Sequence, residues 1–455
     1  MQPAVLIRLR PAGPWRYGPG DGGQTRVDSL FRSDRLFSAL TQAAKQLAFL
    51  EEWLDATAGS SSPALAFSSL YPFQGDVLYV TPPANLWPPP PALVTSPSPV
   101  FLTKVRWNAA YFVPVSLVES ILTGQKVLAD QWAPDPESAC LLRRDRPSTT
   151  PFRTVVRTGA AVDRITKQSS AAHSFAGVEF EPGAGLWTVV QFADETTSQV
   201  WNERIKGMFR LLADTGLGGR RSVGWGQMEA PEFEDGGWPA VLFPRLARAL
   251  AKNGTSDDAQ AGSLYWMLSL FSPAAADAVD WSGGDYKLVE RNTISGKQVR
   301  LVAEGSVVAA SAAPVGKAID IAEGEGRHPV YKSGIALSLK LPSWPEPIPE
   351  EATIEPVPEI VVIEPPEEPA QGPDVPVPEV PVPDIHDPDL PIVVAEAEPQ
   401  AEAENSEVEN PQEIPQTEAT SQDLEAEPPP EVEQTEPEAE AGEEPAGTEE
   451  SNDAV

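Results

Sequence analysis

The sequence predicts an α+β fold: two ferredoxin-like (RRM-like) domains with insertions, followed by a disordered, acidic tail rich in proline and glutamate. In the first part of the chain, strand-like and helix-like segments alternate in the order β-α-β-β-α-β, which defines a ferredoxin-like unit. In the last part, proline and acidic residues replace the apolar residues that a core needs. We place the first domain at 1–235, a connector at 236–262, a smaller second domain at 263–342 and the tail at 343–455.

The net charge of −34 arises in the tail. Residues 346–455 contain 34 acidic and no basic residues, which leaves 33 residues of each sign in the rest of the chain. That neutral body has no overall basic signature, so a nucleic-acid site must depend on local patches. The single Cys140 is typical of a reducing compartment. We expect a cytoplasmic protein, because no apolar run is long enough to span a membrane and Arg8 ends the short run Val5–Ile7 at the N-terminus.

Apolar spacing assigns the elements of the first domain. A helix begins near Ser33, with Ser33 as N-cap and Asp34 in the first turn. These two residues therefore have a structural explanation, which we favour over a ligand role. The predicted strands are 4–10, 66–73, 77–80, 101–107, 177–182, 185–192 and 223–233, and two further helices are predicted at 112–124 and 200–214.

The central feature of the first domain is a glycine-rich loop that follows the helix at 200–214. It contains Gly216, Gly218, Gly219, Arg220, Arg221 and Ser222, and ends with Gly224 and Gly226. Glycine lets a ligand approach the backbone closely, successive N–H groups form an anion-binding concavity, and arginine adds donors suited to phosphate. An ordinary turn would also use glycine, but the paired arginines favour a polyanion site. We expect Gly216 to end the helix.

Two common phosphate motifs do not fit this loop. A nucleotide-hydrolysing P-loop needs a lysine where Arg220 stands, and a Rossmann fingerprint needs a third glycine where Arg221 stands. Both motifs also follow a strand and open a helix, whereas this loop follows a helix and precedes a strand. Trp225, just beyond, could stack on a base, but a core position is favoured.

The most basic segment of the body is 141–167, with seven basic and two acidic residues. We predict a long irregular loop there that binds a nucleic-acid backbone, chiefly through Arg157 and Arg164, with Lys167 at its end. A solvated loop is the alternative. Arg35, in the first helix, is likewise either a solvated residue or an RNA contact.

The second domain should be a reduced ferredoxin-like unit. Strands are predicted at 264–271, 299–302 and 334–341, with short helices at 242–250 in the connector and at 277–281. We expect Gly305 and Gly334 to serve turns.

Four segments resemble one known family. The loop Gly216–Gly226 resembles the glycine-rich loop of the RAMP superfamily, the RNA-binding subunits of CRISPR effector complexes. Ser33–Leu40, Ala161–Thr166, and Ala303–Val307 together with His328–Gly334 resemble motifs of one subunit family, the fourth Csm subunit of type III-A complexes. The resemblance covers roughly residues 1–342. It implies two RAMP domains, contact with the five-prime tag of a CRISPR RNA (crRNA), and contacts with the large polymerase-like Cas subunit and a backbone RAMP subunit.

The residues favour a noncatalytic RNA-binding scaffold without metal or cofactor. Of the three histidines, only His173 lies in a segment expected to face RNA. A metal-independent endoribonuclease that uses His173 is therefore an alternative. The related type III-B subunit and an interaction module driven by the acidic tail are further alternatives, and the last leaves the glycine-arginine loop unexplained.

Overall fold

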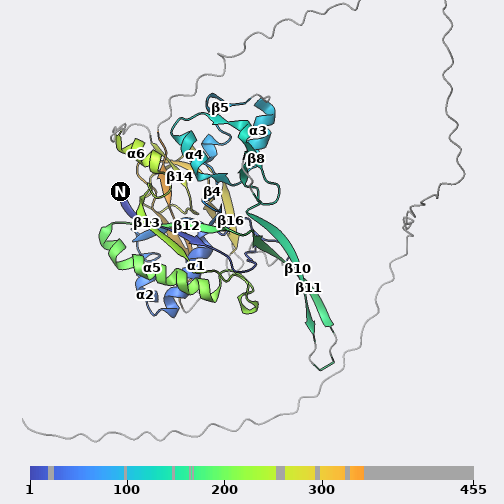
Figure 1. Cartoon of the computed structure of the whole chain (residues 1–455). Helices are drawn as coiled ribbons and strands as arrows, with labels where there is room; N and C mark the ends of the chain where they lie inside the picture. The colour runs from blue at the N-terminus through green and yellow to red at the C-terminus, as the bar shows by residue number, and fades with distance from the viewer. Residues whose placement is uncertain are drawn as a thin grey trace, which may run out of the picture. The chain divides into compact units, whose positions relative to one another are not determined.

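The computed structural model describes residues 1–18, 25–96, 100–145, 149–162, 165–166, 169–252, 262–292, 298–322 and 328–342. The predicted tail at 343–455 lies outside these residues. All described residues belong to one compact unit, Met1–Val357. Figure 1 shows this unit, with a long hairpin projecting from it.

The first domain is built on a ferredoxin-like sheet. Strand β1 (Gln2–Leu9) lies between β13 (Glu232–Trp238) and β12 (Ala184–Phe192), and β3 (Tyr71–Gln74) pairs with the other side of β12. All three pairings are antiparallel. When the strands are numbered along the chain, their order in space is 4-1-3-2. The predicted β-α-β-β-α-β unit is therefore confirmed for this domain.

Two helices complete that unit. Helix α1 (Ser33–Gln46) follows the first strand, with α2 (Leu50–Ala56) after it, and α5 (Glu195–Thr215) follows the third. Helix α5 packs on β1 and β12, beside α1. It is longer than predicted because Asp194 caps it, accepting a hydrogen bond from the Thr197 N–H at 2.7 Å. Its first turn is polar, so apolar spacing did not reveal it.

A large insertion lies between β3 and β12. The segment predicted as a strand at 101–107 is helix α3, because a short apolar run does not distinguish the two structures. The predicted helix at 112–124 is shorter and follows a short strand. The elements are β2 (Leu65–Phe67), which precedes β3 and pairs with β12, then β4 (Val77–Val80), η1 (Ala84–Leu86), η2 (Pro91–Leu93), β5 (Val94–Thr95), α3 (Val100–Asn108), β6 (Val113–Pro114), α4 (Val115–Leu122), β7 (Val127–Leu128), η3 (Ala129–Gln131), β8 (Trp132–Pro134), β9 (Leu141–Arg143), β10 (Phe152–Val162) and β11 (Ser169–Phe180).

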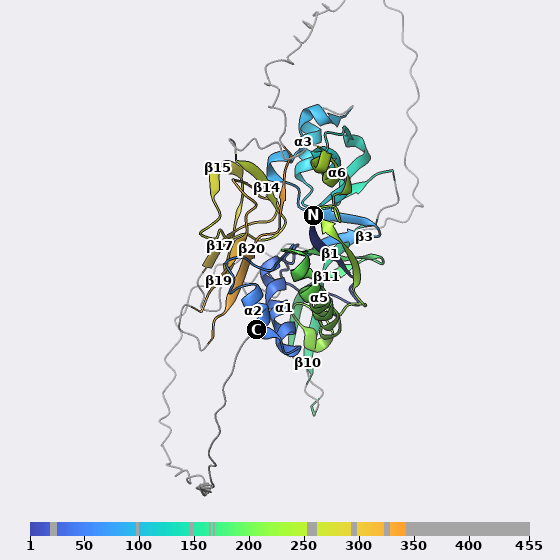
Figure 2. The same cartoon turned by 90° about the vertical axis from the view of Figure 1, so that its left-hand side faces the viewer.

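The second domain repeats the same sheet order without helices. In space the strands run β15-β18-β14-β21, and all pairings are antiparallel, so numbering along the chain again gives the order 4-1-3-2 when read from β21. The described residues of 262–342 contain no helix. Figure 2 shows these strands gathered on one side of the unit. The elements are α6 (Pro244–Lys252) in the connector, then β14 (Ser263–Met267), β15 (Val279–Asp285), β16 (Leu288–Asn292), β17 (Gln298–Val302), β18 (Val307–Ala310), β19 (Gly316–Asp320), β20 (Tyr331–Ile335) and β21 (Ser338–Lys340).

Several sequence predictions for this region are wrong. Gly334, expected to serve a turn, lies within β20 and pairs with Lys317, and the strand predicted at 264–271 ends at Met267. The short helix expected at 277–281 is the start of strand β15, and the single strand expected at 334–341 is divided between β20 and β21. The alternation of apolar residues continues across the break between them, so the pattern could not show it. The connector helix predicted at 242–250 is confirmed as α6.

The two domains share one hydrophobic core. Trp266, Leu268 and Leu339 from the second domain belong to the same buried cluster as the core of the first domain. The Trp266 ring lies 5.8 Å from that of Phe243, in the connector. A smaller separate cluster, which includes Met267 and Val308, covers the other face of the second sheet. Only one face of that sheet is thus buried against the rest of the molecule.

Candidate nucleic-acid interface

The glycine-rich loop begins where α5 ends. Gly216 is the C-cap of the helix, as predicted, with φ of 81°. The chain then makes a short turn, η4 (Arg221–Val223), and Gly224 and Gly226 also have positive φ. The strand predicted to begin at Val223 is therefore wrong for most of its length. It begins only at Glu232, because the left-handed residues interrupt extended backbone.

Backbone hydrogen bonds hold the glycine-rich loop against the segment that follows β1. The Gly219 N–H donates to the Arg16 carbonyl at 2.7 Å, and the Gly226 N–H donates to the Pro14 carbonyl at 3.0 Å. A Cβ on Gly218 would lie 2.5 Å from the Arg16 carbonyl oxygen. Gly218 therefore permits a close contact, but this contact is with the backbone carbonyl of Arg16 and not with a ligand.

Backbone donors remain in the middle of the loop. The N–H groups of Arg220, Arg221 and Ser222 have no hydrogen-bond partner among the described residues. Arg220 is left-handed, with φ of 61°, and the next residues begin the turn. Successive unpartnered amides are a feature of anion-binding loops, so the predicted anion site is placed at Arg220–Ser222.

A pocket of about 410 Å³ brings part of the predicted site together. Arg221 and Arg35 both line it, and so does Arg16, which sequence reasoning missed. None of the described lining residues is acidic. The lining comprises Arg16, Tyr17, Gly18, Phe31, Arg35, Ser38, Ala39, Gln42, Gly216, Leu217, Gly218, Gly219 and Arg221.

The three pocket arginines differ in their surroundings. Arg221 is exposed, with no partner recorded among the described residues. Arg35 pairs with Asp28 at 3.0 Å, and burial and the nearby Arg291 lower its pKa. Arg16 donates to the Ala176 carbonyl at 2.6 Å, and burial and Arg220 lower its pKa. An anion in the pocket would relieve this crowding of positive charge.

Arg220 does not line the pocket. Its guanidinium lies 3.7 Å from the ring centroid of Phe175 and 5.6 Å from that of Trp225. A Cβ on Gly177 would lie 2.7 Å from the Trp225 ring, so loop and hairpin are in close contact. Trp225 is buried, as predicted. Arg220 therefore joins the loop to the β10–β11 hairpin.

The basic segment predicted as an irregular loop is a hairpin. Strands β10 and β11 pair from Phe152↔Phe180 onward, and the hairpin extends away from the sheets (Figure 1). Most of the described side chains of β10 are exposed, so apolar alternation did not reveal that strand. Arg157 forms an ion pair with Glu179. His173 is exposed and pairs with Gly159, whereas Arg164 and Lys167 lie outside the described residues.

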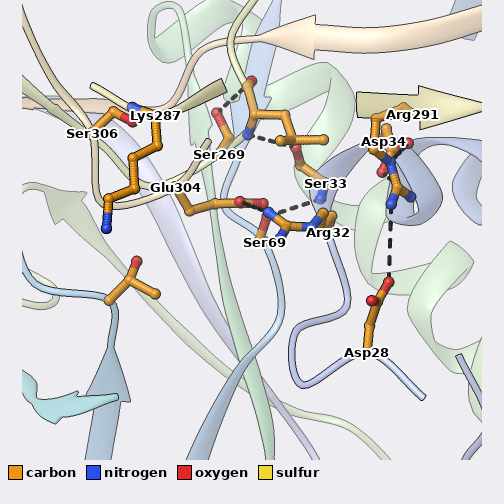
Figure 3. A network of polar contacts seen from close by, with 12 residues as sticks. Asp28, Arg32, Ser33, Asp34, Ser69, Ser269, Lys287, Arg291, Glu304 and Ser306 are labelled. Atoms are coloured by element: carbon orange, nitrogen blue, oxygen red, sulfur yellow. Dashed lines mark hydrogen bonds and ion pairs between the residues drawn. The ribbon is translucent and has the colours of Figure 1, made fainter. Parts of the chain in front are cut away.

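The start of α1, the helix that carries Arg35, is tied to the second domain by buried polar groups (Figure 3). Ser33 is not the N-cap; Arg32 is, and the Ser33 Oγ accepts a hydrogen bond from the Leu270 N–H at 3.0 Å. Asp34 is fully buried and accepts from Arg291 Nε at 2.9 Å. Burial opposes its charge, but Arg291 and Lys332 hold the pKa of Asp34 below its usual value. Glu304 pairs with Arg32 and accepts from Ser69.

Three further features of the described residues bear on function. Within the described residues, histidine, cysteine and carboxylate side chains do not gather into a group that could hold a metal ion. Cys140 is buried, which raises the pKa of its thiol. The described helices include none with the length and apolar character needed to span a membrane.

Two ferredoxin-like sheets with a glycine-rich loop after the second helix of the first define a RAMP-like protein. Residues 260–341 match the family model of the CRISPR Csm4 C-terminal domain. A Csm4 protein of Thermococcus onnurineus (strain NA1) is 25% identical over 236 residues, which cover 51% of this chain and 68% of that protein. The chain is thus similar to the Csm4 family model over its second domain and to one Csm4 protein over about half of its length, in agreement with the resemblance of its motifs.

Solved structures similar to this chain include two Csm4 assemblies. A Csm3–Csm4 subcomplex of a type III-A interference complex matches with 13% identity and a TM-score of 0.48, covering 75% of this chain and 100% of that chain. A Csm1–Csm4 cassette bound to pppApA matches with 19% identity and a TM-score of 0.45, covering 76% of this chain and 99% of that chain.

Proposed function

We propose that this chain is a noncatalytic RNA-binding subunit of a type III-A CRISPR (Csm) effector complex in antiviral defence. It holds the five-prime tag of the crRNA and bridges the large polymerase-like Cas subunit to the RAMP backbone. The observation that carries the RNA-binding part is the pocket at the glycine-rich loop, where Arg16, Arg35 and Arg221 meet with no acidic residue among the described lining.

The chemistry of the pocket suits a phosphate backbone. Arginine binds phosphate through charge-assisted hydrogen bonds, and backbone N–H groups add donors at no cost in side-chain entropy. The loop is fixed by its hydrogen bonds to Pro14 and Arg16, so these donors are held before RNA arrives. Such contacts bind a strand without cleaving it.

The partner part of the proposal is based on the similarity of this chain to Csm4 proteins. The similar solved structures hold Csm1 or Csm3 beside Csm4, and we extend these two classes of partner to this chain. Because the family match is to a Csm subunit, we place the chain in a type III-A complex rather than in type III-B.

The test is RNA binding by the full chain as a function of salt. Arg35→Gln and Arg221→Gln should each weaken binding of a fluorescein-labelled single-stranded RNA and reduce the log–log salt slope by about 0.7–1. Arg300→Gln is the matched control, since Arg300 is exposed and pairs with Glu290 on the β16–β17 hairpin. Unchanged slopes in both pocket variants would contradict the phosphate assignment.

The same preparation tests the endoribonuclease alternative. Incubation with a CRISPR repeat RNA should leave the RNA intact. If the RNA is cleaved at one position and His173→Ala abolishes this cleavage, the protein is an endoribonuclease and not a noncatalytic scaffold.

A further inference from the structure

A row of alternating charges leads from the second domain to the pocket. In order it contains Lys332, Asp34, Arg291, Asp28 and Arg35, and the successive N···O distances are 3.2, 2.9, 3.9 and 3.0 Å. The first and third residues lie on β20 and β16 of the second domain, and the last lines the pocket. The row therefore links a domain that contributes no described lining residue to the RNA site.

Arg291 is fixed in direction by Asp34. Its Nε and Nη2 donate to the two carboxylate oxygens at 2.9 and 3.1 Å, and its Nη1 faces Asp28. The side chains of Arg291 and Asp34 are 6% and 0% exposed, so water screens the pair weakly. Lys332 also donates to the Asp34 carboxylate. One negative charge is therefore shared by two positive groups, and Arg291 keeps positive charge that can act on Asp28.

Asp28 lies between two arginines and uses one oxygen for both. Its Oδ2 accepts from Arg35 Nη1 and faces Arg291 Nη1. A carboxylate beside Arg35 competes with phosphate for that guanidinium. Arg35 has five N–H donors, so the donors that do not face Asp28 can reach the pocket, provided that the charge of Asp28 is offset from elsewhere.

We propose that Arg291 is a positioning residue for the RNA pocket, although it does not line it. By offsetting the charge of Asp28, it leaves Arg35 available to phosphate, and the second domain thereby tunes RNA affinity. This inference rests on the proposed RNA-binding function. It gives a reason why Arg291 faces a second carboxylate, Asp28, in addition to its ion pair with Asp34.

A charge-rescue experiment tests the role of Arg291. Using the full chain and the labelled single-stranded RNA, Arg291→Gln should weaken binding about fivefold. Asp28→Asn alone should tighten binding by a similar factor, because it removes the competing carboxylate. The double variant should bind as the unchanged protein does. Arg300→Gln, on the same hairpin as Arg291, should leave affinity unchanged.

The outcomes separate a positional role from a merely structural one. A double variant that binds as weakly as Arg291→Gln would overturn the proposal, since loss of folding cannot be rescued by Asp28→Asn. Weaker binding by Asp28→Asn would also overturn it, because the carboxylate would then orient Arg35 instead of competing. If Arg291→Gln does not fold, Asp28→Asn is measured in two backgrounds. It should tighten RNA binding in the otherwise unchanged chain and have no effect on RNA binding in the Arg35→Gln chain.

The two proposals can fail separately. If Arg35→Gln and Arg221→Gln leave RNA affinity unchanged, the RNA-binding function itself fails. If those variants weaken binding and Arg291→Gln does not, only the role of Arg291 fails.

Discussion

The two sheets of this protein have the same strand order but are covered differently. The first sheet carries α1 and α5, which follow its first and third strands, as a complete ferredoxin-like unit requires. In the second sheet, the described residues between the corresponding strands contain no helix. The same topology thus occurs once with its own helical layer and once without it.

The second sheet compensates by using the first domain as its cover. Trp266 and Leu339 enter the common core, and α1 packs against β20, which belongs to the separate β19–β20 pair of the same domain. The buried ion pairs of Asp34 and Glu304 lie at this junction. Because the described residues of the second domain include no helix to cover its sheet, the sheet buries its apolar face against the first domain, whose helix α1 carries Arg35.

The largest effect should follow from emptying the shared core. Trp266→Ala removes a fully buried indole at the junction, and we expect a loss of about 5 kcal/mol in the free energy of unfolding. Val308→Ala, in the separate cluster on the other face, should cost about 2 kcal/mol. Denaturant unfolding followed by tryptophan fluorescence and by circular dichroism measures both. Equal losses would show that the second sheet does not depend on the shared core more than on its own cluster.

A smaller loss should follow from breaking the ionic junction between the domains. Asp34→Asn removes the carboxylate that pairs with buried Arg291 and half-buried Lys332 and leaves Arg291 only the more distant Asp28, and we expect a cost of about 3 kcal/mol. Glu290→Gln, in the exposed pair with Arg300, should cost less than about 1 kcal/mol. A negligible change at Asp34 would mean that the domains are joined by apolar contacts alone.

The pH dependence of stability is a second test of the ionic junction at Asp34. Because the folded pKa of Asp34 is lowered, its contribution is present above the unfolded aspartate value of about 4 and is lost as pH falls through the folded pKa. The melting temperature of the unchanged chain should therefore fall more steeply below about pH 4 than that of Asp34→Asn. Parallel curves for the two proteins would contradict the assignment.

Local patterns predicted the parts of the first domain that have an apolar face. The spacing of Trp201, Ile205 and Phe209 predicted helix α5, and the glycine-rich composition correctly marked a loop after it. Arg35 and Arg221 do meet in one pocket. These features depend on neighbours in the sequence, which a single chain reveals.

Other parts of the site depend on residues far apart in sequence. The partners of Asp34 lie 257 and 298 positions away, so its role at the junction could not be read from a capping pattern. Arg16 stands in a loop of glycine, proline and aspartate, and only the packing of Gly218 on its backbone brings it to the pocket. The guanidinium of Arg220, which was predicted to bind phosphate, lies over Phe175, a residue just outside the predicted strand 177–182.

The smallest effect in this series compares one glycine from each domain. Gly218 and Gly316 have φ of 95° and 72°, and a Cβ would lie 2.5 Å from the Arg16 carbonyl oxygen and 2.2 Å from that of Gly334, respectively. Each change to alanine should cost about 1–3 kcal/mol of stability through the same backbone strain. Only Gly218→Ala should also weaken RNA binding, by about tenfold, since it displaces a pocket wall and the amides beside it. Equal loss of affinity in the two variants, measured by fluorescence anisotropy at matched folded fractions, would mean that RNA senses the stability of the chain and not the geometry of the loop.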